Sequence, residues 1–149
     1  MTARSVLSLA VAEDGAPVIG MVPFVVEPDF AAVLVHVSRL APHGRALGTG
    51  VDFALLIHGP DLPGANPGEI PRLRFSGAAK HLTRDSAAYA TARDRYLHRF
   101  PDSAVTFGLG DFELYRLPLE RGRLVAGFAR AVNLTADSLK RLAAAPPDV

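Results

Sequence analysis

An Asp-Gly pair near the N-terminus separates two apolar runs and limits the local structures open to this chain. The pair lies in Glu13-Asp14-Gly15, between the apolar segments Ser5–Ala12 and Pro17–Val26. Both central residues of a tight hairpin turn adopt positive φ angles, for which Asp and Gly are well suited. The sequence therefore predicts an antiparallel hairpin. A third apolar segment, Ala31–Val37, follows the turn Glu27-Pro28-Asp29 and extends the hairpin to a three-stranded meander.

The later segments add further strands and a smaller number of helices. Apolar or alternating patterns predict strands over Val51–His58, Ile70–His81, Asp111–Pro118 and Leu124–Val132. Helices are predicted around Pro42, over Thr83–Arg99 with Thr83 or Asp85 as the cap, and over Thr135–Ala144. Turn residues predict a long loop over Gly59–Glu69, a turn at Glu120-Arg121-Gly122, and a bulge or close approach at Gly77. Six or seven antiparallel strands with two or three short helices favour a barrel of the mainly β (α+β) class, because closure removes unpaired edges.

Composition and charge exclude several classes of function. The 149 residues suffice for a single domain, 1–149, and the chain contains no cysteine, which excludes disulfides and thiolate chemistry. A net charge of +1 without runs of like charge argues against nucleic-acid binding. The longest apolar stretch, Ala16–Val26, is too short to cross a membrane. A cytoplasmic location is expected, with secretion as the alternative because residues 4–12 resemble a short signal peptide.

Several short segments, taken in order, resemble a known family. They are Asp14-Gly15-Ala16-Pro17, Met21-Val22-Pro23-Phe24, Val37–Leu47, Pro71-Arg72-Leu73 with Ser76-Gly77, Arg99–Asp102, Gly110-Asp111-Phe112 and Gly127–Ala131. Their order and spacing resemble the flavin-binding split barrels of the pyridoxamine 5′-phosphate oxidase-like superfamily, with the haem-utilisation proteins as the nearest branch. The resemblance covers nearly the whole chain and implies an antiparallel split β-barrel of six to seven strands.

The resemblance also implies a homodimer that holds flavin mononucleotide (FMN) at the subunit interface. The phosphate would lie at the turn Ser38–Arg45, where free backbone N–H groups and side-chain donors can meet an anion. Arg72 is a second candidate for the phosphate, and the strand Met21–Phe24 would border the flavin ring. The residues expected to bind the cofactor are Met21, Val22, Pro23, Phe24, Ser38, Arg39, Leu40, His43, Arg45, Arg72 and Arg130.

The sequence departs from the family pattern at two places that concern ligands. Ala46 stands where related proteins often carry an Asn. Haem-utilisation members use a C-terminal histidine as haem ligand, whereas no histidine follows His98 in this sequence. The remaining histidines have no metal-like spacing, so structural roles and no metal site are expected for His36, His58, His81 and His98.

Three functions stay open at this point. The resemblance favours an FMN-binding flavoprotein with flavin-dependent oxidoreductase activity on an unknown small molecule. The alternatives are a non-catalytic ligand-binding or regulatory split barrel, and a haem-handling protein of the related branch. No nucleophile–base pair or pair of carboxylates stands out, so no catalytic residue is assigned. For haem, the strong axial ligands of this sequence are confined to its five histidines.

Overall fold

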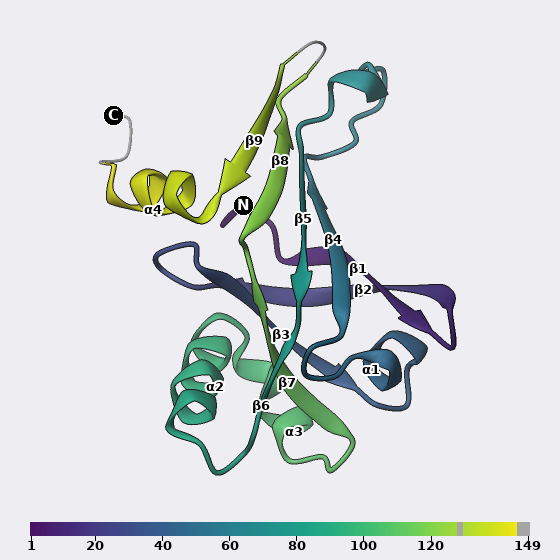
Figure 1. Ribbon diagram of the computed structural model, residues 1–149, viewed down its shortest axis with the longest axis vertical. Coiled ribbons are helices and arrows are strands. Elements are labelled where there is room, and N and C mark those ends of the chain that lie inside the picture. The colour runs from purple at the N-terminus through teal and green to yellow at the C-terminus, as the bar shows by residue number, and fades with distance from the viewer. Residues whose placement is uncertain (128–129, 146–149) are drawn as a thin grey trace.

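The computed structural model describes residues 1–127 and 130–145 of the chain. Within these residues, nine strands form one curled antiparallel sheet in the order β6-β7-β3-β2-β1-β4-β5-β8-β9 (Figure 1). The strands are β1 (Val6–Glu13), β2 (Ala16–Val26), β3 (Ala32–Ser38), β4 (Asp52–His58), β5 (Arg72–Ala78), β6 (Lys80–Leu82), β7 (Phe112–Pro118), β8 (Arg121–Val125) and β9 (Ala131–Thr135). The helices are α1 (Pro42–Ala46), α2 (Ala87–Arg99), α3 (Ala104–Phe107) and α4 (Ala136–Ala144), with 3-10 turns η1 (Pro67–Glu69) and η2 (Pro101–Ser103).

The N-terminal hairpin and meander are confirmed. Asp14 and Gly15 both have positive φ, at 52° and 80°, and the β1–β2 register closes on the pair Glu13–Ala16. β3 then pairs with the C-terminal part of β2. Residues 32–37 of β3 are all buried, as expected for a strand with helices on one face and the barrel interior on the other.

β2 belongs to two half-sheets at once. Residues 16–23 pair with β1, and residues 24–26 pair with β3. The large half-sheet contains β2, β1, β4, β5, β8 and β9, and the small half-sheet contains β2, β3, β7 and β6. β5 and β7 approach across the curl, since a Cβ built on Gly77 would lie 3.5 Å from the Pro118 carbonyl oxygen. The mainly β antiparallel split-barrel class is thus confirmed.

The strand count is higher than predicted because two expected strands each divide. The segment Ile70–His81 breaks at Ala79, whose N–H donates to the Val51 carbonyl, so that β6 leaves β5 and pairs with β7. The segment Leu124–Val132 divides into the ends of β8 and β9, and residues 128–129 lie outside the described part. The predicted turn at Glu120-Arg121-Gly122 is wrong, since β8 begins at Arg121 and pairs with β5. The register of β4 and β5 runs unbroken through Gly77, so no bulge forms there.

The helices begin where side chains satisfy free backbone N–H groups. α2 starts after Ser86, whose Oγ accepts from the Tyr89 N–H at 3.1 Å, so neither predicted cap, Thr83 or Asp85, holds. α4 starts at Thr135, which forms a capping box with Ser138. The four-residue helix α3 was missed. None of the helices in the described residues has the length and apolar character needed to cross a bilayer.

Two apolar clusters stabilise the fold. The larger fills the curled sheet, with side chains such as Leu9, Phe24 and Phe75 almost fully buried. The second lies between the small half-sheet and the helices α2 and α3, which Figure 1 shows together at one end of the molecule. His36 of β3 is buried beside this second cluster. Its ring stacks on the Phe107 ring, with the two ring centroids 3.8 Å apart.

Candidate functional site

The outer face of the large half-sheet carries the most distinctive chemistry of the described residues. Along β4, Phe53, Leu55 and Ile57 are buried, whereas the alternate residues Asp52, Ala54, Leu56 and His58 are exposed. The same alternation exposes Arg72, Arg74 and Ser76 on β5. Side chains of paired residues share a face of the sheet, so these rows form one surface.

The strand register gathers arginines on this surface. Arg74 of β5 pairs directly with Arg123 of β8, and Ser76 pairs with Arg121. None of the ion pairs found in the described residues includes Arg74, Arg121 or Arg123. Like charges directly opposite each other on neighbouring strands repel. Such a cluster without a carboxylate partner is suited to an anionic ligand.

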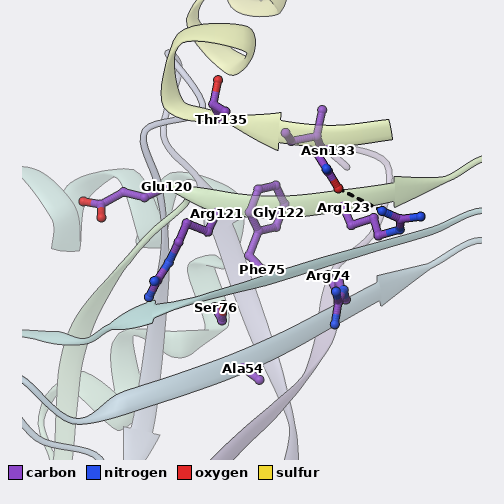
Figure 2. A pocket seen from close by; sticks show the side chains of 11 residues that line it. Ala54, Arg74, Phe75, Ser76, Glu120, Arg121, Gly122, Arg123, Asn133 and Thr135 are labelled. Atoms are coloured by element: carbon purple, nitrogen blue, oxygen red, sulfur yellow. Dashed lines mark hydrogen bonds between the residues drawn. The ribbon is translucent and has the colours of Figure 1, made fainter. Parts of the chain in front are cut away.

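The three arginines line a hollow of about 410 Å³. Its other lining residues are Ala54, Phe75, Ser76, Glu120, Gly122, Asn133, Leu134 and Thr135. Figure 2 shows the arginine side chains rising from β5 and β8, with Asn133 of β9 facing Arg123. The Arg123 Nη1 group donates to the Asn133 Oδ1 atom at 2.9 Å, which fixes one edge of the hollow. We call Arg74, Arg121 and Arg123 the arginine cluster.

A second hollow, of about 260 Å³, lies at the end of the sheet where β4 ends and β5 begins. Arg4, His58 and Arg72 line it together with the core-facing side chains of Ile57, Leu73 and Leu124. A smaller hollow shares Arg4 and His58 and adds Val6, Met21 and Leu56. Four apolar side chains of this face are exposed, namely Val6 (40%), Ile19 (72%), Met21 (74%) and Leu56 (38%). The face therefore has an apolar half on β2, β1 and β4 beside a basic half on β5 and β8.

At the turn predicted to hold a phosphate, several side chains that could bind an anion already contact carboxylates. Ser38 Oγ donates to Asp111 Oδ2 and also accepts from the Leu40 N–H. Arg39 donates to the Gly110 carbonyl at 3.1 Å and lies 3.7 Å from Glu113. The Leu40 side chain is exposed.

The helical part of this turn packs on the first hairpin. The His43 ring covers Gly20 of β2, and burial lowers the pKa of His43, so the ring is neutral at pH 7. Arg45 Nε donates to Glu13 Oε1 at 2.5 Å. The hydrogen bond from Arg45 lowers the pKa of Glu13, so the Glu13 carboxylate and the Arg45 guanidinium are both charged at neutral pH. The positive charges of this turn are therefore largely matched by carboxylates, whereas those of the arginine cluster are not.

The structure brings only some of the predicted residues together. Met21 and Arg72 lie on the outer face of the large half-sheet, each beside His58 in a hollow. Val22 and Phe24 are buried in the core, and Pro23 between them is exposed. Arg130 is exposed in the connection between β8 and β9, next to residues outside the described part. These two hollows include no residue of Ser38–Arg45 among the described residues that line them.

Sequence reasoning missed the arginine cluster. Its signal is the repeated Arg-x-Arg spacing of Arg72-Leu73-Arg74 and Arg121-Gly122-Arg123, which places alternate arginines on one face of each strand. The spacing alone does not reveal that the two strands are neighbours. Among the described residues, no three histidine or acidic side chains gather as a metal site.

Comparison with known proteins finds relatives that are named for haem. No family model matches the chain. The heme oxygenase HutZ of Vibrio cholerae is 29% identical over 140 residues, which cover 91% of this chain and 77% of HutZ. The crystal structure of HutZ, described as the heme storage protein from Vibrio cholerae, matches 82% of this chain and 85% of its own with a TM-score of 0.71 at 27% identity. These likenesses support the predicted resemblance to the pyridoxamine 5′-phosphate oxidase-like split-barrel superfamily. The likeness to HutZ supports its haem-utilisation branch.

Other solved structures share the fold at lower identity. A heme binding protein from Mycobacterium smegmatis matches 92% of this chain with a TM-score of 0.78 at 24% identity. This chain spans only 55% of that protein's length. A pyridoxinephosphate oxidase family protein from Clostridium acetobutylicum matches with a TM-score of 0.58 at 11% identity. These likenesses establish the split barrel and leave the ligand to be argued from the site.

Proposed function

We propose that this split barrel is a haem-handling protein that binds haem on the outer face of its large half-sheet. The observation that carries the proposal is the arginine cluster, which forms no ion pair with a carboxylate of the described residues and lies beside exposed apolar side chains of β1, β2 and β4. Haem is a flat, largely apolar ring with two carboxylates. The apolar half of the face suits the ring, and arginine pairs well with a carboxylate. The HutZ relative, named for haem, supports the same ligand.

The residues of the face fit haem in charge and polarity. Met21, Leu56 and Val6 would contact the ring, and the arginine cluster with Arg72 would hold the carboxylates. Bound haem would supply iron redox chemistry, while the chain supplies position, charge and exclusion of water.

The exposed apolar half of the face also supports a homodimer. Ile19 and Met21 leave most of their side-chain surface in solvent on the same face. An apolar patch of this kind on a sheet is typical of a protein interface. A two-fold dimer through this face would enclose the hollows between two copies. We expect it to bury ~2,000 Å² or more, as obligate dimers do.

An FMN-dependent oxidoreductase is the second candidate. A flavin also combines a flat ring with an anionic group, so the arginine cluster fits its phosphate as well. The predicted phosphate turn is less suited, because Glu13, Asp111 and Glu113 occupy its donors. That assignment stays a prediction, as does the cytoplasmic location, with which the cysteine-free composition agrees.

Spectroscopy of the purified chain tests the proposal. Haem and FMN are each titrated into the protein, and binding is followed by the Soret band and by flavin fluorescence. The double variant Arg74→Gln/Arg123→Gln is compared with Lys140→Gln, which removes a positive charge from the exposed face of α4. Saturable haem binding that weakens only in the double variant supports the proposal. Tight FMN binding without haem binding would replace it with the flavoprotein, and binding of neither would leave the non-catalytic alternative.

A further inference from the structure

Four of the five histidines lie away from the proposed ligand face or are already engaged. His36 is buried, with 5% of its surface exposed. His81 Nε2 is bonded to Glu113 Oε2 at 2.9 Å. His43 packs over Gly20, and His98 lies on α2. Only His58 lies on the outer face of the large half-sheet.

His58 occupies the border between the apolar and basic halves of this face. It ends β4 two residues after Leu56, with its side chain exposed on the same side. The register pairs it directly with Arg72 of β5. It also lines the smaller hollow of the outer face, which contains Met21 and Leu56, and the hollow at the end of the sheet, which contains Arg72. A group bound across the two halves would therefore contact His58.

A hydrogen bond fixes the tautomer of the His58 ring. The Nδ1 atom lies 2.6 Å from the Gly59 carbonyl oxygen. A carbonyl oxygen can only accept, so Nδ1 carries the proton and donates it. The neutral ring then keeps its lone pair on Nε2. Histidines that bind metals in proteins are oriented in the same way, with the other ring nitrogen donating to a carbonyl or carboxylate.

We infer that His58 is the axial ligand that binds the iron of haem through Nε2. The inference rests on the proposed function, because it needs haem on this face. It assigns to His58 a role that its spacing in the sequence did not indicate. A single imidazole suffices here, since the porphyrin supplies the other nitrogen ligands, so the lack of a three-residue metal site in the described residues is no obstacle.

The test compares His58→Ala with the matched variant His98→Ala, which also removes an exposed histidine. Hemin is titrated into each protein, and the complex is examined by absorption and by electron paramagnetic resonance. We expect the parent and His98→Ala to show imidazole-ligated iron. His58→Ala should lose that signature and bind hemin at least ~10-fold more weakly, as losses at metal sites commonly do. Added imidazole should restore the signature to His58→Ala. Because residue 58 is exposed, both variants are expected to fold, which thermal melts will check.

The outcomes separate the inference from the proposed function. A parent that binds hemin while His58→Ala keeps the imidazole signature overturns the assignment of His58 and leaves haem binding intact. A parent that does not bind hemin overturns the proposed function and the assignment with it. Loss of the signature in His98→Ala as well as in His58→Ala would also overturn the assignment.

Discussion

The imidazole of His43 covers Gly20 so closely that a Cβ built on this glycine would lie within 2.4 Å of two ring atoms. Helix α1 can approach the hairpin only because β2 has no side chain at this point. We expect Gly20→Ala to lower the free energy of unfolding by about 1–3 kcal/mol, the usual cost of overpacking. Chemical denaturation measures the change.

The double variant Gly20→Ala/His43→Ala is the control for this contact. With the ring gone, the added methyl group has room, and an alanine is slightly better than glycine inside a strand. The cost of Gly20→Ala should therefore largely disappear in the His43→Ala background. If Gly20→Ala lowers the free energy of unfolding equally in both backgrounds, the His43 ring is not what excludes a side chain at position 20.

Removing charge from the arginine cluster should stabilise the free protein. Arg74→Gln relieves repulsion between Arg74 and Arg123, which are paired directly on neighbouring strands. At low salt the gain should be about 0.2–1 kcal/mol. Sulfate should raise the Tm of the parent more than that of the variant, because it binds the intact cluster. Lys140→Gln should show neither effect, and a loss of stability in Arg74→Gln would contradict the repulsion.

His36 should make stability depend on pH. Burial, reinforced by the nearby positive charge of Arg84 and opposed by Glu113, lowers the pKa of His36 to about 4. In the unfolded chain its pKa is about 6.5. The unfolded state therefore takes up the proton first, so the stabilising contribution is complete above pH 6.5 and is lost as pH falls towards 4. The loss amounts to about 3 kcal/mol.

The variant His36→Leu isolates this contribution from other titrations. Its stability at pH 7 should be lower, because Leu lacks the stacking contact of the imidazole with Phe107 and the bond to Thr106. Between pH 7 and pH 4, however, it should lose less stability than the parent. Parallel pH profiles for the two proteins would show that His36 titrates normally in the folded state.

Met21 should contribute to dimerisation. Met21→Glu places a charge in the apolar half of the proposed interface, so sedimentation velocity at micromolar concentration should show a dimer for the parent and a monomer for the variant. Val105→Glu is the matched control, since Val105 has the same exposed fraction, 74%, on helix α3. A parent that sediments as a monomer would refute the dimer.

Local patterns were sufficient for the elements that short-range chemistry determines. The Asp14-Gly15 turn and the apolar segments around it defined the meander, because turn conformation and strand burial are both local properties. The division of Ile70–His81 was not predictable, because it depends on a bond between Ala79 and the distant Val51. In the candidate site, too, local features were predictable and features that depend on distant residues were not. Arg72 was a candidate from its segment, whereas the cluster of Arg74 with Arg123 exists only through the pairing of β5 with β8.

The double membership of β2 determines how the protein can open. Its residues 16–23 bond to one half-sheet and residues 24–26 to the other, so neither half can separate without exposing backbone of the shared strand. Local opening is therefore confined to the periphery, such as β9 with α4. Amide deuterium exchange should be equally slow at residue 9 of β1 and residue 35 of β3, because both amides are released only when the whole barrel unfolds. Two apolar clusters would then behave as one cooperative unit in hydrogen exchange.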